Sequence, residues 1–366
     1  MRKIGYLAAL GLLALPLSQD AQAADDGKVY YKGGSVLEFP DFKMKINSQI
    51  QTIYQYKEFE ESEAREEDDT SGFDVKRARL QVSGDALGGM WSYRLQNDFA
   101  SDSGGGDLKD AWLQLNLDEA AMMRMGQFKE PFSRQAVASS AAQQLVDRSI
   151  VTNTFARGRD VGAMLHGAVS ESLGYSLAVF NGESEGEGAN KNATDNNLKG
   201  VAQLVAFMGD YGDRGHEGDH RDGGDFAMTF GAAAAYGEGQ DENGVEGDAV
   251  DLNADVGVRV QGASLQGEYF WTENNPDGGD STDLNGFYVQ GGMMFGDWEP
   301  VARYGWVDPD GEEGIDELTE YAVGINYFFA GHSLKATAQV TWEDTEFLDN
   351  TELTDTRAEL QLTAYL

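Results

Sequence analysis

The sequence predicts an all-β protein, a transmembrane antiparallel β-barrel of about sixteen strands. Three observations lead to this prediction. Apolar and polar residues alternate with a period of two along most of the chain. The alternating segments are about ten residues long, which suits a tilted strand that crosses a bilayer. Short turns and longer polar connectors follow these segments in alternation, as in barrels with short turns at one end and long loops at the other.

The amino terminus predicts export. Arg2 and Lys3 precede an apolar run from Ile4 to Leu17, and Ala21-Gln22-Ala23 supplies small residues for a cleavage site. This is the layout of a secretory signal peptide over residues 1–23. The apolar run is too short for a membrane anchor, so the mature chain is either soluble beyond the inner membrane or a β-barrel.

The mature chain begins with residues 24–41, for which we predict a periplasmic N-terminal segment, and the barrel is predicted over 42–366. Successive side chains of a strand point to opposite faces, so a period of two gives one apolar and one polar face. In the closing segment, 356–366, the even positions from Ala358 to Leu366 are all apolar, whereas the odd positions are mostly polar.

The same alternation recurs along the rest of the chain. It predicts strands over residues 42–57, 73–84, 90–101, 108–117, 121–129, 159–169, 173–181, 198–208, 225–236, 249–260, 263–273, 284–295, 298–307, 318–329, 333–344 and 356–366. One connector departs from the pattern, because 209–224 is long and polar where a short turn is expected. Aromatic residues fall near many strand ends, as interfacial girdles do.

A soluble β-sandwich is the alternative, because burying the apolar face inside the protein produces the same alternation. The signal peptide, the number of strands, the asymmetry of the connectors and the strand at the carboxyl terminus favour the barrel.

Composition excludes several classes. The chain has no cysteine, which excludes disulfides and thiolate metal sites. It carries 27 Lys and Arg against 63 Asp and Glu, a formal charge of -36, whereas a nucleic-acid binder should be basic. The acidic run from Glu58 to Asp69 is predicted to be a solvated outer loop. Such loops are expected to share divalent cations with neighbouring lipopolysaccharide.

Parity along the strands indicates which charges face the lumen. Arg77, Arg79, Arg94 and Arg124 alternate with apolar residues and therefore have inward parity. A cationic side chain on the lipid face near the middle of the bilayer costs about 2–4 kcal/mol, so parity is a strong constraint.

Positive charge gathers in one region. Residues 76–159 hold 11 Lys and Arg against 9 Asp and Glu, whereas the remainder holds 16 against 54. The connector 130–158, the third long one, adds further arginines to those of the strands. The candidate pore-lining and anion-binding residues are Arg77, Arg79, Arg94, Arg124, Lys129, Arg134, Arg148, Arg157 and Arg159. The alternative is that these cations form ordinary lumen ion pairs with nearby carboxylates, among them Asp98, Asp110, Glu130 and Asp147.

One motif matches the signature of an enzyme, but the residues around it argue against that function. His216-Glu217-Gly218-Asp219-His220 matches the H-E-x-x-H pattern of zinc proteases, which requires a helix to bring both histidines to one face. The glycines in and around the motif disfavour a helix. We therefore expect no catalytic residue, no metal site and no cofactor.

Several short motifs resemble one family. They are Lys76-Arg77-Ala78-Arg79-Leu80, Asn97-Asp98-Phe99, Lys109-Asp110-Ala111-Trp112, Gly126-Gln127-Phe128-Lys129-Glu130-Pro131-Phe132, Gly158-Arg159-Asp160-Val161-Gly162, Trp298-Glu299-Pro300-Val301-Ala302-Arg303-Tyr304 and Gly324-Ile325-Asn326-Tyr327-Phe328. In their order and spacing the chain resembles the phosphate-selective porin (porin O and P) family of Gram-negative outer membranes. The resemblance implies a sixteen-stranded barrel, usually trimeric, with its third loop folded into the pore and cationic side chains that guide anions.

We therefore expect an outer-membrane porin for small hydrophilic solutes, above all anions such as phosphate. It is expected to form a homotrimer, to contact outer-membrane lipid and lipopolysaccharide, and to bind no nucleic acid. The alternatives are a general or cation-preferring porin, a structural or adhesive barrel with a blocked lumen, and a soluble β-rich periplasmic enzyme.

Overall fold

The computed structural model describes residues 27–60, 68–100, 106–156, 158–182, 197–221, 224–240, 246–310 and 314–366. The predicted signal peptide and Arg157 lie outside these ranges.

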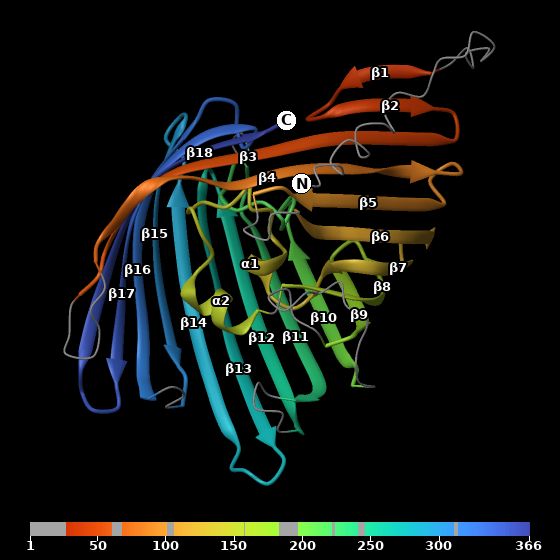
Figure 1. Ribbon diagram of the computed structural model, residues 1–366. Coiled ribbons are helices and arrows are strands. Elements are labelled where there is room, and N and C mark those ends of the chain that lie inside the picture. Colours follow the sequence, from red (N-terminus) through yellow and green to blue (C-terminus); the bar gives the residue numbers. More distant parts are fainter. Residues whose placement is uncertain are drawn as a thin grey trace, which may run out of the picture.

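In the described part of the chain, sixteen antiparallel strands, β3 to β18, form a closed barrel (Figure 1). Their bounds are β3 Phe42–Glu58, β4 Thr70–Ala86, β5 Trp91–Asp98, β6 Asp107–Asp118, β7 Ala121–Lys129, β8 Arg159–Ser170, β9 Leu173–Phe180, β10 Lys199–Met208, β11 Ala227–Gln240, β12 Glu246–Val260, β13 Ala263–Pro276, β14 Thr282–Met293, β15 Trp298–Asp308, β16 Ile315–Phe328, β17 Leu334–Phe347 and β18 Glu352–Tyr365. The last strand pairs with β3, from Thr356↔Glu58 to Tyr365↔Gln49, and closes the sheet. The predicted fold class is confirmed.

Several strands extend further than predicted at the end of the barrel that carries the long loops. For example, β18 begins at Glu352 rather than 356, and its ladder with β17 reaches Glu346↔Glu352. Polar residues there do not alternate with apolar ones, because the strands have left the bilayer, but their backbones still pair. The period of two therefore underestimates the strand length.

A hairpin precedes the barrel where the sequence predicted no strand. Strands β1 (Lys28–Tyr31) and β2 (Ser35–Phe39) pair with each other, and β2 also pairs with the first residues of β3, from Ile46 to Phe42. The turn between them contains Gly33 and Gly34, whose φ angles of 56° and 143° suit glycine. The hairpin extends the sheet beyond the point at which β18 ends (Figure 1).

Burial follows the predicted parity. Ile50, Met125 and Leu362 are 49%, 70% and 52% exposed on the outer surface, whereas Gln51 and Gln361, each next to one of them, are 0% and 2% exposed. The outer surface is therefore apolar and the inner surface polar, as a barrel in lipid requires. Within the described ranges, no helix has both the length and the apolar composition needed to cross a membrane.

Candidate pore constriction

The third long connector folds inward from the end of β7. It contains helices α1 (Arg134–Val137) and α2 (Ile150–Phe155), which are capped by Ser133 and Ser149 (Figure 1). Alanine and glutamine are frequent from Arg134 to Val146 and favour a helix, but α1 ends after one turn. The residues that follow bond to the barrel wall instead, since Asn326 donates to the carbonyl oxygen of Gln144 (2.7 Å).

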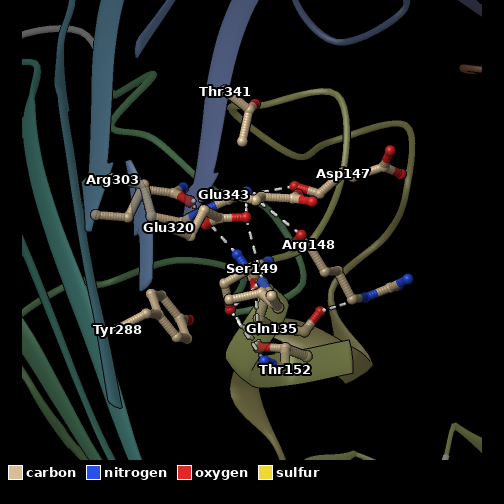
Figure 2. Close-up of polar contacts among 12 residues, drawn as sticks. Gln135, Asp147, Arg148, Ser149, Thr152, Tyr288, Arg303, Glu320, Thr341 and Glu343 are labelled. Carbon is tan, nitrogen blue, oxygen red and sulfur yellow. Dashed lines mark hydrogen bonds and ion pairs between the residues drawn. The ribbon is translucent and has the colours of Figure 1, made fainter. Parts of the chain in front are cut away.

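A buried ion pair fixes this connector to the wall formed by β15 and β16 (Figure 2). The Nε atom of Arg303 lies 2.5 Å from Oε1 of Glu320. The Arg303 guanidinium also donates to the carbonyl oxygens of Asp147 (2.9 Å) and Arg148 (3.3 Å), and Glu320 accepts from the backbone nitrogen of Ile150 (3.3 Å). These bonds hold the second half of the connector against the far wall.

Glutamine 135 joins the two helices of the connector. Its side-chain oxygen accepts from the backbone nitrogen of Ser149 (2.8 Å), from the Ser149 hydroxyl (3.1 Å) and from the Thr152 hydroxyl (2.9 Å), as Figure 2 shows. The connector therefore has an internal polar core and keeps one shape against the wall.

The unusual connector between β10 and β11 also enters the barrel. Its residues Gly209–Arg221, here called the inner segment, meet the third long connector along two backbone hydrogen bonds, from Ser139 to Gly215 (2.9 Å) and from Glu217 to Ala142 (2.9 Å). The sequence analysis did not predict this placement. The only signal was the length of the connector at an end where the other turns are short.

The H-E-x-x-H motif lies within the inner segment and forms no helix. The ring centres of His216 and His220 lie 5.4 Å and 4.3 Å from that of His332, which belongs to the turn between β16 and β17. Across the described residues, no group of three or more acidic or histidine side chains has the geometry to hold a metal ion. Both histidine rings of the motif thus pack against His332.

A cavity of about 500 Å³ remains between the two inward connectors and the wall that runs from β3 to β10. Five of the predicted cations line it: Arg79, Arg94, Arg124, Lys129 and Arg159. Among the described residues, its carboxylate lining consists of Asp110 and Asp213. The open part of the lumen is therefore basic, although the chain as a whole is strongly acidic.

Two of these cations bind neutral partners. Arg124 lies 4.2 Å above the centre of the Trp112 ring and donates to the side-chain oxygen of Gln114 (2.7 and 2.9 Å). Lys129 donates to the carbonyl oxygens of Val137 (3.2 Å) and Ala138 (2.7 Å). Neither forms a direct ion pair with any carboxylate in the described part of the chain.

The other three cations of the cavity have carboxylate partners. Arg79 pairs with Asp98 (2.6 Å) and also donates to the Ser140 hydroxyl of the third connector. Arg94 (3.7 Å) and Arg159 (2.9 Å) share Asp110. Asp110 therefore contacts two arginines of the cavity lining at once.

Arg77 lies nearer the outer end, away from the cavity lining. It donates to Gln51 (2.8 Å) and lies 3.9 Å from Asp147, which also pairs with Lys76. Burial alone would raise the pKa of Asp147, but the charges of Lys76 and Arg77 outweigh it and hold that pKa below its usual value. Asp147 therefore stays ionised at neutral pH and offsets these cations.

Arg134 and Arg148 serve the third connector itself. Arg134 is buried against the opposite wall, where it pairs with Asp255 (3.2 Å) and donates to Thr229 (2.7 Å). Arg148 donates to the carbonyl oxygen of Gln135 (3.0 Å) and to two further carbonyl oxygens of the connector. The structure thus gathers five of the nine predicted cations in one cavity and places these two elsewhere.

The comparisons with known proteins agree with this architecture. The phosphate-selective porin O and P family matches residues 44–363. The outer membrane channel DcaP of Acinetobacter baumannii is 12% identical, with a TM-score of 0.63 over 90% of this chain and 99% of that one. The anion-selective porin from Comamonas acidovorans is 13% identical, with a TM-score of 0.60 over 88% and 99%. The in-vitro folded trimer form of OmpT from Vibrio cholerae is 14% identical, with a TM-score of 0.58 over 89% and 100%.

At these identities the likeness to the solved structures shows the fold alone. No curated protein matches the sequence. The family match, in contrast, spans most of the chain, and the family and the barrel fold together indicate a Gram-negative outer membrane and a channel rather than an enzyme. This chain is an outer-membrane porin and belongs to the phosphate-selective porin O and P family.

Proposed function

We propose that this porin prefers anions and passes them by diffusion through the basic cavity. The observation that supports the proposal is the cavity lining, in which five cations accompany two carboxylates among the described residues, and Arg124 and Lys129 form no ion pair with a described carboxylate. In bulk water, two unit charges 4 Å apart interact by about 1 kcal/mol, and the interaction is several times larger in a narrow, partly desolvated pore. Acidic outer loops act weakly there, because salt screens charges beyond about 8–10 Å.

Small anions in general fit this lining better than phosphate alone. Strict phosphate selection requires several donors that converge on one dry site. Asp110 lies between Arg94 and Arg159 and repels a dianion placed there, which favours anions of low charge. Inorganic phosphate is one of the solutes that we expect to pass.

The double variant Arg124→Gln/Lys129→Gln is expected to lose most of the anion preference. It removes the two lining cations that form no ion pair with a carboxylate among the described residues, and glutamine keeps an amide donor at each position. The reversal potential of channels in planar bilayers under a salt gradient measures the effect. The matched control is Lys28→Gln/Lys32→Gln, which also removes two positive charges, but from the N-terminal hairpin outside the barrel.

The wild type must show an anion-directed reversal potential, and the double variant must shift it while the control does not. A wild-type channel that prefers cations contradicts the proposal and favours a cation-preferring porin, for which the acidic composition is the supporting observation. Barrels that insert but conduct no current indicate a blocked lumen and a structural role.

For the mature protein we also propose cleavage after Ala23, a periplasmic position for residues 24–41 and assembly as a homotrimer in contact with lipopolysaccharide. The trimer form of OmpT, which shares the fold, supports this assembly. Mass spectrometry of the purified protein tests the cleavage site, and chemical cross-linking in detergent tests the trimer. A single monomeric band at every cross-linker concentration contradicts the trimer.

A further inference from the structure

We propose that the inner segment, Gly209–Arg221, determines selectivity by shielding an acidic wall of the lumen. This inference rests on the proposed anion preference. According to this proposal, the inner segment and the third long connector cover the wall formed by β12 to β16. Solutes then meet only the basic wall on the opposite side of the lumen.

The covered wall is rich in carboxylates. Its inward-facing acidic residues include Asp255, Glu268 and Glu299, each of which is almost completely buried. If they faced an open lumen, they would attract cations and oppose the basic wall. The selectivity of the pore therefore depends on what covers them.

The inner segment supplies a cation directly to this wall. One guanidinium nitrogen of Arg214 lies 2.7 Å from each carboxylate oxygen of Asp255, which also pairs with Arg134 of the third connector. In the opposite direction, Arg259 of the wall donates to the carbonyl oxygen of Tyr211 (2.6 Å) and lies 4.2 Å from the centre of its ring. The wall and the inner segment thus satisfy each other's charged and hydrogen-bonding groups.

The wall also has a shape that admits the inner segment. Gly257 occupies an inward position of β12, and a side chain there would overlap the Tyr211 hydroxyl and the Arg134 guanidinium. Gly231 of β11 lies opposite Asp255 in the ladder, and a side chain there would overlap the carboxylate that Arg214 binds. Two inward glycines on adjacent strands therefore leave the space that the inner segment and Arg134 fill.

Glu217 connects the inner segment to the third connector and to the wall at once. Its carboxylate accepts from the backbone nitrogen of Gln144 (2.7 Å) and from the side chains of Gln266 (3.0 Å) and Gln290 (2.9 Å). A shift of the inner segment would leave these donors unsatisfied and loosen the third connector. The two inward connectors therefore cover the wall as one unit.

The inner segment also borders the open cavity. Asp213, Gly215 and His216 contribute to its lining, opposite the arginines of β4 to β8. Removing the segment would widen the lumen and expose the acidic wall in one step. Two separate readouts follow, conductance and ion preference.

The test replaces residues 211–225 with the two-residue turn Asn-Gly. The strands then join where β10 and β11 already pair, next to Met208↔Met228, and Asn-Gly favours the turn type that suits such a hairpin. We expect a barrel with normal heat-modifiable gel mobility and a larger single-channel conductance. We also expect its reversal potential to shift toward the value for a cation-selective channel. Adding Asp255→Asn and Glu268→Gln to this variant is expected to shift the reversal potential back toward the value for an anion-selective channel.

The matched control grafts the same Asn-Gly turn in place of residues 277–281, which join β13 to β14 at the long-loop end. It is expected to leave both readouts at wild-type values. If the first graft fails to assemble, Gly257→Leu takes its place, because it displaces Tyr211 and retains the chain length. Its control is Ala254→Leu on the outer face of the same strand.

The outcomes separate the two proposals. A wild type without anion preference overturns the proposed function. Unchanged conductance and reversal potential in the Asn-Gly variant, or in Gly257→Leu where that variant is used, overturn the shielding role. A shift toward cations that Asp255→Asn and Glu268→Gln do not reverse also overturns it, because the exposed carboxylates would then not be its cause.

Discussion

Replacing Arg303 with alanine is expected to destabilise the barrel and release the third long connector. Arg303 and Glu320 are both buried, and loss of one partner of a buried ion pair costs about 3–5 kcal/mol because the other charge is left uncompensated. The substitution also removes two hydrogen bonds to the carbonyl oxygens of Asp147 and Arg148. Urea unfolding in detergent measures the loss of stability, and noisier, larger channel currents report the released connector.

Two further variants separate charge burial from anchoring. Arg357→Ala removes an inward arginine of β18 that forms ion pairs with the carboxylates of Glu343 (2.9 Å) and Glu359 (3.4 Å), so it should leave the connector in place. The double variant Arg303→Met/Glu320→Leu removes both buried charges. It should recover stability, but its channel currents should stay noisier than those of the wild type. Quiet wild-type currents in Arg303→Ala would contradict the anchoring role.

A positive charge on the lipid face is expected to block assembly. Leu362 in β18 is exposed on the outer surface, and an arginine there costs about 2–4 kcal/mol near the middle of the bilayer. Because β18 closes the barrel against β3, this free-energy cost opposes the closure of the barrel. We expect Leu362→Arg to accumulate as unassembled protein, which heat-modifiable gel mobility detects.

The control for this variant is Gln361→Arg, one position earlier in the same strand. Gln361 faces the lumen and donates to the Thr363 hydroxyl, so an arginine there remains among the polar side chains of the inner surface. It is expected to assemble. Equal assembly of the two variants would contradict the assignment of the outer face.

The barrel could be predicted from the sequence because its strands are set by local alternation. At the end of the chain, the even positions from Ala358 to Leu366 are apolar, as an outward face requires, and the pattern needs no knowledge of the partner strands. The same parity identified Arg79, Arg94 and Arg124 as inward-facing, and all three line the cavity. Strand ends were less predictable, because pairing continues at the polar rims after alternation has stopped.

The contents of the lumen could not be predicted in the same way. Arg134 and Arg148 lie in a connector, where parity gives no direction, and their partners come from distant strands or from the connector's own carbonyl groups. The contacts of Glu217 likewise join residues that are remote in sequence. The β1–β2 hairpin was missed because four- and five-residue strands are too short for a clear period.

The pairing of β18 with β3 has a consequence for how the chain folds. Gln55 donates to Glu359 (2.8 Å), which lies 304 residues later, whereas every other neighbouring pair of barrel strands is joined by a single connector. Hairpins can therefore form as soon as their two strands are available, but the seam must wait for the last residues of the chain. Until then the sheet has two open edges that can pair with other chains. The nascent protein thus depends on being kept apart from its own copies during its passage to the membrane.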